Sequence, residues 1–596
     1  MAQRLRKQFI GKFLANGLTD ALYAQEGDPN SQIGGCISLQ NLVPDRHTRG
    51  IYSPRPAYTS GFNAASAPGT AGGTGITTIG HIVVMLVLGS RVYGMCNGSN
   101  SSTYYDMPFC YDFNTGAFVT ITGFTNANCP KTSGYPNGSG GSGNVAADWT
   151  PPCMCQVGTK IIVTHYGFSG TGNYIGWIDI STPSAPTWSA GNLSGAGGLS
   201  FTTPPVSVTQ FNGRAYYAVG GVAATNNVIF SDSLNATVCT NATQVLTIGD
   251  NQPIVGFGAQ PYQSSTVGGV IQSVLCFKAN SIAQITGDPT TSNLAVSVIR
   301  TGTGTLAANT IASTPLGCMF MASDGIRFVD TDGNVSAPLP SVRNPFANAN
   351  LLSGQCFPTT ACAAYNSGMY RISLYTTDLI GNIYRQEYVF DLEYGWHGPH
   401  LYDASPAQTG VSVISPYAAK FITANRINIP GNAYTNSNLA VLSTLDPGPA
   451  DAFIESAATL TWNMQGSGQD DQYPMQVKSI KQATIAYNPG NASGSITVSA
   501  NPTLVGTNPN VNQPPSQSST LMFTPSGSLW GTAVWGAFTW GGSSLTSMDE
   551  TTVKFPDTVA YKNVQFQVSG TSALNQRIGP ISYRGNLIGY TNQDVA

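Results

Sequence analysis

Charged residues are scarce in this sequence of 596 residues. They account for 9% of the chain, whereas an ordinary soluble protein has about 25%. Lys and Arg together number 25 and Asp and Glu 28, so there is no basic excess to neutralise the phosphates of a nucleic acid. This balance argues against a protein that grips DNA, but not against one that lets DNA slide past. Disorder is not indicated either, because aromatic residues reach 10% and disordered chains are poor in them.

Long apolar runs are also lacking. The longest is 82–88, far short of the roughly 20 residues that a membrane-spanning helix needs. The basic N-terminus is followed by a partly apolar stretch, 9–24, but Lys12, Asn16 and Asp20 interrupt it, so we expect no secretory signal peptide. Amphipathic helical periodicity is nearly absent, and Gly, Asn, Pro and Asp separate many short apolar runs. The pattern predicts an all-β chain of many short strands.

Ligand sets for a metal or a cofactor are missing as well. His397 and His400 lie three residues apart, but the Gly-Pro between them excludes a helix that would bring them together. Cys153 and Cys155 are separated by one residue, which is not the spacing of a zinc knuckle or a redox motif. We interpret the 11 cysteines as small, mostly buried apolar residues and expect no metal and no cofactor.

Catalytic groups are not evident in the sequence. A glycosidase needs two carboxyl groups across a cleft, whereas the neighbours Asp470-Asp471 and Asp549-Glu550 would point to opposite faces of a strand. No Gly-x-Ser-x-Gly motif stands between a strand and a helix. A carboxylate pair formed across separate sheets is neither supplied nor excluded. We therefore assign no catalytic, cofactor-binding or metal-ligating residues and expect that the chain is not an enzyme.

The chain does contain a degenerate repeat of a short strand, a polar turn that usually holds Asp, and a second strand. Successive copies lie roughly 50–65 residues apart, close to the period of a kelch-type propeller blade. The turn Asp can accept a hydrogen bond from the backbone two residues on, which is a structural role. A ring of such sheets buries the faces that one sheet cannot bury alone. The six copies are 111–119, 177–188, 228–232, 274–285, 326–335 and 388–396.

The length of the chain exceeds what one core supports, so we expect several domains. An N-terminal segment, 1–60, precedes a β-propeller-like domain, 61–430, in which a Gly/Ser-rich surface loop is expected at 132–144. From about residue 432 the repeat gives way to alternating strands such as 457–464. A C-terminal β-sandwich-like platform domain is therefore predicted over 431–596.

Several segments, taken in order, resemble the tail-nozzle (tail-hub) proteins of short-tailed bacteriophages. Each motif alone is weak, and their order over nearly the whole chain carries the resemblance. The opening stretch reads N-x-x-P-D and then R-P, and the later ones are a blade with F-N-G-R and S-D, a strand ending in a turn and Trp, and two closing strands. These segments are 38–45, 50–56, 211–217, 229–232, 277–288, 317–326, 388–396, 561–570 and 581–585.

The resemblance implies a virion protein, assembled in the host cytoplasm, that forms a hexameric ring through which DNA is retained and ejected. It implies a propeller on the outside and a central channel, with portal-adaptor proteins, tail fibres or tailspikes and passing genomic duplex DNA as partners. We expect the channel wall to be neutral to negative, since basic residues are scattered apart from Arg4, Arg6 and Lys7. That cluster is expected to touch a neighbouring subunit or the adaptor.

Two alternatives stay open at this point. One is a glycan-binding or glycan-cleaving virion-associated propeller, which a buried carboxylate pair in the propeller mouth would favour. The other is a secreted adhesin or lectin-like propeller, which a cleaved N-terminus would favour. The abundant Tyr and Trp would suit sugar binding, but sheets also use them for cross-strand packing, which we favour.

Overall fold

The computed structural model is built almost entirely of antiparallel strands, so the all-β prediction is confirmed. The model describes residues 8–13, 35–45, 48, 50–55, 59–60, 69–71, 74–76, 82–98, 105–131, 151–168, 172–195, 197–219, 226–264, 269–288, 293–339, 342, 344–349, 360–377, 383–401, 409–417, 420–427, 442–444, 454–455, 458–459, 461–468, 476–489, 494–503, 515–523, 548–571 and 576–590. No helix in these ranges is long and apolar enough to span a membrane.

The chain forms two compact units. The propeller unit comprises Thr59–Glu387 and Ser405–Leu445, and the sandwich unit comprises Met1–Tyr58, Tyr388–Ala404 and Asp446–Ala596. Within the predicted N-terminal segment 1–60, the strands of residues 8–54 pair in the sandwich unit, whereas Thr59–Ser60 pairs in the propeller unit. The predicted loop 132–144 and the cluster Arg4, Arg6 and Lys7 lie outside the described residues.

Seven small sheets make up the propeller in the described part of the chain. The first four, in chain order, are β8 (Ile82–Leu88), β9 (Arg91–Gly98), β10 (Tyr105–Asp112) and β11 (Ala117–Val119); β12 (Cys153–Val157), β13 (Lys160–Thr164), β14 (Ile175–Asp179) and β15 (Thr187–Gly191); β16 (Ser207–Phe211), β17 (Arg214–Ala218), β18 (Asn227–Phe230) and β19 (Val245–Thr247); and β20 (Ile254–Ser264), β21 (Gly269–Lys278), β22 (Ser281–Thr286) and β23 (Ala295–Thr301).

The remaining three sheets are β24 (Ala312–Thr314), β25 (Gly317–Ala322) and β26 (Gly325–Asp330); β27 (Cys362–Asn366), β28 (Met369–Thr377), β29 (Ile383–Asp391) and β30 (Gly395–His400); and β31 (Thr409–Tyr417), β32 (Lys420–Ile427), β33 (Leu442–Thr444) and β5 (Thr59–Ser60). Smaller elements are the hairpin β6 (Gly69–Ala71) and β7 (Thr74–Ile76), the 3-10 turn η2 (Ala308–Thr310) and the helix α1 (Asn344–Ala349).

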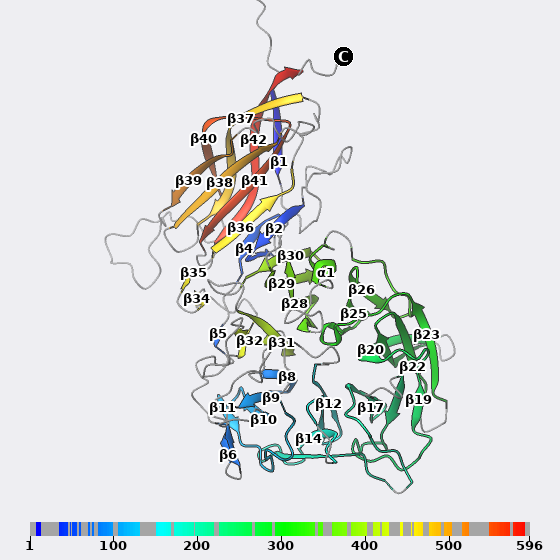
Figure 1. The fold of residues 1–596 in the computed structure, drawn as a ribbon. Coiled ribbons are helices and arrows are strands. Elements are labelled where there is room, and N and C mark those ends of the chain that lie inside the picture. The colour runs from blue at the N-terminus through cyan, green and yellow to red at the C-terminus, as the bar shows by residue number, and fades with distance from the viewer. Residues whose placement is uncertain are drawn as a thin grey trace, which may run out of the picture. The chain divides into compact units, whose positions relative to one another are not determined.

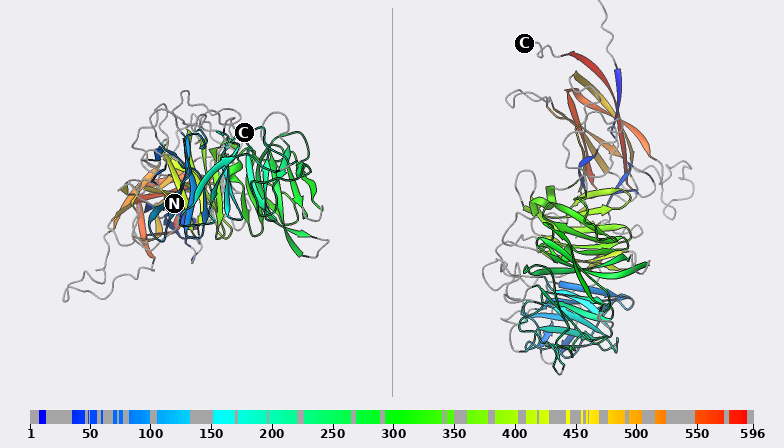
Figure 2. Two further views of the ribbon diagram at one scale, coloured as in Figure 1. Left: turned by 90° about the horizontal axis from the view of Figure 1, so that it is seen from below. Right: turned by 90° about the vertical axis from the view of Figure 1, so that its right-hand side faces the viewer.

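The sheets close into a ring, as Figure 1 shows. The first strand of each sheet contacts the first strand of the next, in the order β8, β12, β16, β20, β24, β27 and β31, and β31 contacts β8 again. β5 pairs with β33, Ser60 opposite Ser443, so a strand from the start of the unit completes the last sheet. Figure 2 shows the same ring edge-on, with its sheets side by side. Closure protects the inner edges of the sheets.

The predicted repeat copies fall in the first six of these sheets, and the predicted turn chemistry is confirmed in four of them. In each, Asp Oδ1 accepts a hydrogen bond from the backbone N–H two residues on. The pairs are Asp112 with Asn114 (2.9 Å), Asp179 with Ser181 (2.9 Å), Asp330 with Asp332 (2.9 Å) and Asp391 with Glu393 (2.8 Å). The side chain therefore fixes the turn that joins two strands.

Apolar and aromatic side chains fill the space between neighbouring sheets. Phe277 of β21 and Phe320 of β25 are both 0% exposed, and their ring centroids lie 4.9 Å apart. Tyr216 and Phe230 stack within the third sheet at 5.5 Å. Such contacts bury the faces that the strand pattern leaves apolar. Aromatic residues at these positions serve packing, as we expected.

The sandwich unit has two sheets. One runs β3 (Leu42–Pro44), β4 (Tyr52–Pro54), β42 (Arg577–Tyr590), β37 (Gln476–Asn488) and β40 (Asp549–Tyr561), with β1 (Gln8–Phe13) also on β42; the other runs β2 (Cys36–Gln40), β36 (Thr461–Gly466), β41 (Asn563–Thr571), β38 (Gly494–Thr503) and β39 (Gln517–Phe523), and β34 (Ile454–Glu455) pairs with β35 (Ala458–Thr459).

Side chains from the two sheets meet in the core of the sandwich unit. The rings of Phe566 and Tyr583 lie 4.7 Å apart. Gln576 accepts a hydrogen bond from Trp462 Nε1 at 3.1 Å and donates one to Tyr487 Oη at 2.5 Å, and all three side chains are buried. The predicted sandwich-like C-terminal domain is confirmed as a fold, and the bridging network satisfies its buried polar groups.

Candidate functional site

The centre of the propeller is the place where the sheets converge, and the described strands that surround it carry no charge. The seven innermost strands, β8, β12, β16, β20, β24, β27 and β31, contain no Asp, Glu, Lys, Arg or His. The centre of a propeller normally brings together loops and strand ends from several sheets. Here the described innermost strands bring together uncharged side chains only.

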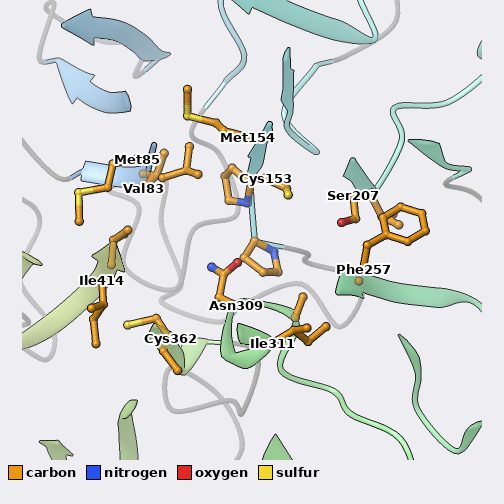
Figure 3. Close-up of a pocket in the computed structure, with 18 residues that line it drawn as sticks. Val83, Met85, Cys153, Met154, Ser207, Phe257, Asn309, Ile311, Cys362 and Ile414 are labelled. Carbon is orange, nitrogen blue, oxygen red and sulfur yellow. The ribbon is translucent and has the colours of Figure 1, made fainter. Parts of the chain in front are cut away.

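A cavity of about 190 Å³ lies at this centre (Figure 3). Six of the seven sheets contribute to its wall, together with η2 and Ile311, and most of the lining residues are apolar, with Ser207 and Asn309 among the polar ones. The lining residues are Val83, Val84, Met85, Pro151, Pro152, Cys153, Met154, Val206, Ser207, Gly256, Phe257, Ala308, Asn309, Ile311, Cys362, Ala363, Val413 and Ile414. A space of this size holds a few waters or one small molecule, since a cavity of roughly 150 Å³ can take up benzene.

Several charged groups in the propeller unit are buried, do not line this cavity, and are paired with other protein groups. Lys278, 1% exposed, donates from Nζ to the backbone oxygens of Ile248 (2.5 Å) and Asp250 (2.6 Å) and to Asp250 Oδ1 (2.7 Å). These three bonds use all three N–H groups of the ammonium. Lys278 in turn holds the pKa of Asp250 below its usual range. The lysine therefore joins the third and fourth sheets.

A second buried pair lies between the first two sheets. Asp106 Oδ2 and His165 Nε2 are 2.7 Å apart, and neither side chain is exposed. His165 Nδ1 accepts the backbone N–H of Gly167 at 2.9 Å, so the hydrogen on the ring is on Nε2 and points to Asp106. Burial raises the pKa of Asp106, and His165 only partly offsets this. With no access to solvent, the pair has a structural role.

A third buried pair joins the sixth and seventh sheets. Arg371 of β28 donates from Nη1 to Glu387 Oε1 at 3.2 Å, and the Arg371 guanidinium lies 4.9 Å from the centre of the Phe421 ring of β32. Arg371 is 7% exposed and Glu387 0%. The guanidinium is thus held by a carboxylate and an aromatic face together, an arrangement that favours Arg over Lys.

The histidines considered from the sequence are brought together by the fold. His397 and His400 lie on β30, both buried, with Nδ1 of His397 3.1 Å from Nε2 of His400. No group of three His, Cys, Asp or Glu side chains suited to a metal occurs among the described residues. Cys153 and Cys155 are partly buried on β12.

The carboxylates considered from the sequence form no site in the described residues. Asp549 and Glu550 are the first residues of β40, where they pair with Tyr487 and Ala486 and so alternate between the faces of the sheet. Asp470 and Asp471 lie outside the described residues.

Sequence reasoning missed a polar junction in the sandwich unit. Asn41 Oδ1 accepts hydrogen bonds from Arg55 Nε (3.1 Å) and from the backbone N–H of Leu401 (2.9 Å), and Asn41 Nδ2 donates to Thr461 O (2.8 Å). Arg55 Nη2 also donates to Leu401 O at 2.7 Å. Asn41 has a φ of 56°, a conformation that Asn tolerates better than most residues. The only sequence feature that could have indicated this junction is an Asn placed between two short apolar runs.

No protein-family model matches this chain, and no curated protein is similar to it in sequence. Among solved structures, it is similar to the exo-β-1,3-galactanase of Phanerochaete chrysosporium, at 11% identity and a TM-score of 0.24 over 72% of this chain and 95% of that one. The β-propeller domain of the Trilobed protease of Pyrococcus furiosus matches at 8% identity and a TM-score of 0.32, over 62% and 97% of the two chains. The GH62 α-L-arabinofuranosidase catalytic domain of Coprinopsis cinerea matches at 9% identity and a TM-score of 0.25, over 65% and 97%.

The prediction that the chain is not an enzyme is corrected here, because it rests only on the lack of local catalytic motifs in the sequence. In a propeller, groups from separate sheets meet at the centre, so a site needs no local motif. The absence of such a motif from the sequence therefore does not exclude catalysis.

Proposed function

We propose that this chain is a virion protein that forms the tail nozzle of a short-tailed bacteriophage, a ring of copies through which the genome is retained and then ejected. The order of the nozzle-like motifs along the chain supports this proposal, because they span both units. The observation that carries it is the junction of Asn41 and Arg55, which belong to the opening motif and bind Leu401 and Thr461. Because the opening motif joins distant segments of the sandwich unit, its presence supports an architecture shared with the nozzle proteins.

The dimensions of the propeller support a ring of several copies. The cavity at its centre is about 190 Å³ and is lined by residues from six of the seven sheets and from η2. Duplex DNA, whose major groove alone is about 12 Å wide, cannot enter such a space. DNA that moves past this protein must therefore pass between copies, through a channel that the assembly encloses.

The charge of the chain suits a passage through which DNA moves without being held. Each phosphate that a protein neutralises adds to a steep, salt-dependent affinity. With 25 basic residues against 28 acidic ones, a ring of these chains has a net negative charge. Buried Lys278 and Arg371, whose charged groups are engaged by protein contacts, are also withdrawn from any channel wall.

Glycan cleavage or binding by the propeller is the second candidate function, raised by the glycoside hydrolases among the similar structures. A glycosidase of the usual kind needs two carboxyl groups about 5–9.5 Å apart. Among the described residues, the lining of the central cavity includes no carboxyl group. The described centre therefore offers no carboxyl pair for a glycosidase site on the propeller axis.

The two candidates can be separated on the purified full chain. Light scattering measures the mass of the particle, and reducing-end release from a panel of bacterial and plant polysaccharides measures cleavage. The nozzle predicts a particle several times the 62.4 kDa chain mass. A stable monomer that shortens a polysaccharide would replace the nozzle with the second candidate.

A further inference from the structure

One edge of strand β42 in the sandwich unit pairs with two separate strands. Its other edge pairs with β37 along most of its length. On the edge in question, Tyr52 of β4 pairs with Ile578, and β1 then pairs over six residues, from Phe13 opposite Ile581 to Gln8 opposite Asn586. Figure 1 shows β1, in blue, beside the red β42. We call the β42 edge from Ile581 to Asn586 the β1 slot.

The β1 slot requires an occupant. Ile581 is 0% exposed and Tyr583 3%, and the Tyr583 ring packs on Phe566 of the opposite sheet. An empty slot would leave a row of unpaired backbone N–H and C=O groups beside this apolar core, which promotes pairing with another chain. A strand in the slot supplies those hydrogen bonds and completes the sheet.

β1 is attached to the rest of its unit by a long connection. Among the described residues, β42 is the only strand with which β1 pairs. Twenty-two residues separate Phe13 from Cys36, the first residue of β2. Connections longer than about 12–15 residues are uncommon inside a compact domain. A fully extended chain of 22 residues spans about 75 Å. A domain of the size of the sandwich unit is roughly 45 Å across.

We propose that in the assembled ring β1 of each copy occupies the β1 slot of the neighbouring copy, so that exchanged strands join the subunits. The inference rests on the ring of the proposed function. The exchanged strand makes the same backbone pairs as it would in its own chain, so exchange costs little and adds a link between subunits. The long connection gives β1 the reach that such an exchange needs. A head-to-tail exchange fills every slot when the rotation between copies closes the assembly into a ring.

Cysteine cross-linking tests where β1 sits. Lys12 and Ser582 are partners in the register, as are Ile10 and Arg584, so the pairs Lys12→Cys with Ser582→Cys and Ile10→Cys with Arg584→Cys can each form a disulfide. After mild oxidation of the assembled protein, a non-reducing denaturing gel should show a ladder of covalent oligomers. Each single-cysteine variant is the matched control for the 11 native cysteines. A monomer band with the two engineered cysteines joined within one chain would overturn the exchange.

A deletion gives a second measurement that does not depend on disulfide chemistry. A variant lacking residues 1–13 should keep the strands of both units, as judged by circular dichroism, and should no longer form the ring in light scattering. Rings that survive this deletion would also overturn the exchange. If the unmodified chain itself forms no ring, the proposed function fails; if it forms a ring and β1 is joined within its own chain, only the exchange fails.

Discussion

Arg55 donates a hydrogen bond from Nε to Oδ1 of Asn41 at 3.1 Å, and both residues are buried, at 4% and 3% exposure. The same Asn41 side chain binds Leu401 and Thr461, which lie 360 and 420 residues further along the sequence. The side-chain amide of Asn41 thus joins its own segment to those of Leu401 and Thr461, which are far apart in the sequence. Removing it would leave buried donors and acceptors without partners.

Replacing Asn41 with Ala should therefore lower the free energy of unfolding of the sandwich unit by roughly 3 kcal/mol. Asn212→Ala is the matched control, because Asn212 has a similar φ of 48° but makes an exposed hydrogen bond to Gly287. The control substitution should lower the free energy of unfolding by about 1 kcal/mol, mostly because Ala tolerates the left-handed backbone conformation less well than Asn. Calorimetry of the two variants measures the difference. Equal losses would show that the junction of Asn41 adds nothing beyond its backbone conformation.

The turn after β26 gives a test of the repeat chemistry. Asp330 Oδ1 accepts the backbone N–H groups of Asp332 (2.9 Å) and Asn334 (2.8 Å). Asp330→Ala should lower the free energy of unfolding by about 1–2 kcal/mol, and Asp330→Asn should lose less because its amide oxygen can still accept. Asp332→Ala, at an exposed position of the same turn, should stay within about 0.5 kcal/mol of the parent. Thermal unfolding of the three variants decides, and an equal loss for both Ala variants would contradict the assigned role.

Two aspartates of β10 should give opposite dependences of stability on pH. Burial raises the pKa of Asp106 above the ordinary 3.8. Hydrogen bonding to Arg91 lowers the pKa of Asp112 below that value. The stability linked to Asp106 is fully present below pH 3.8 and is lost as the pH rises through its raised pKa. The stability linked to Asp112 is present above pH 3.8 and is lost as the pH falls through its lowered pKa.

Asn variants isolate the two contributions. Relative to the parent, Asp106→Asn should gain stability as the pH rises above about 4, because Asn needs no charge in the buried site. Relative to the parent, Asp112→Asn should lose stability as the pH rises towards about 4 from below. Urea unfolding over this range measures both. The assignment fails if the two variants shift the pH profile in the same direction.

The parts of the fold that depend on local sequence were predictable, and the parts that depend on distant contacts were not. The Asp turns at Asp112, Asp179 and Asp330 are local, so the repeat located six of the sheets. The seventh sheet has no such turn in the repeat, and its outer strand β5 comes from the far end of the unit. No local pattern marks a pairing between residues that are almost 400 positions apart.

The same limit applies to the candidate site. The sequence indicated few charged residues, but it could not show that the seven innermost strands contain none, because the strand order within each sheet decides which strand is innermost. It also could not place Asn41 beside Leu401 and Thr461. The inference that the chain is not an enzyme failed for this reason, since it treated a site as a local motif.

Electron cryo-microscopy of the purified full chain tests the nozzle most directly. The account predicts rings of cyclic symmetry, six-fold as the sequence resemblance implies, with a central channel wide enough for duplex DNA and a wall poor in Lys and Arg. The channel should lie between copies, because the cavity inside each propeller is only about 190 Å³. Isolated monomers at micromolar concentration, or rings whose channel is too narrow for a duplex, would contradict it.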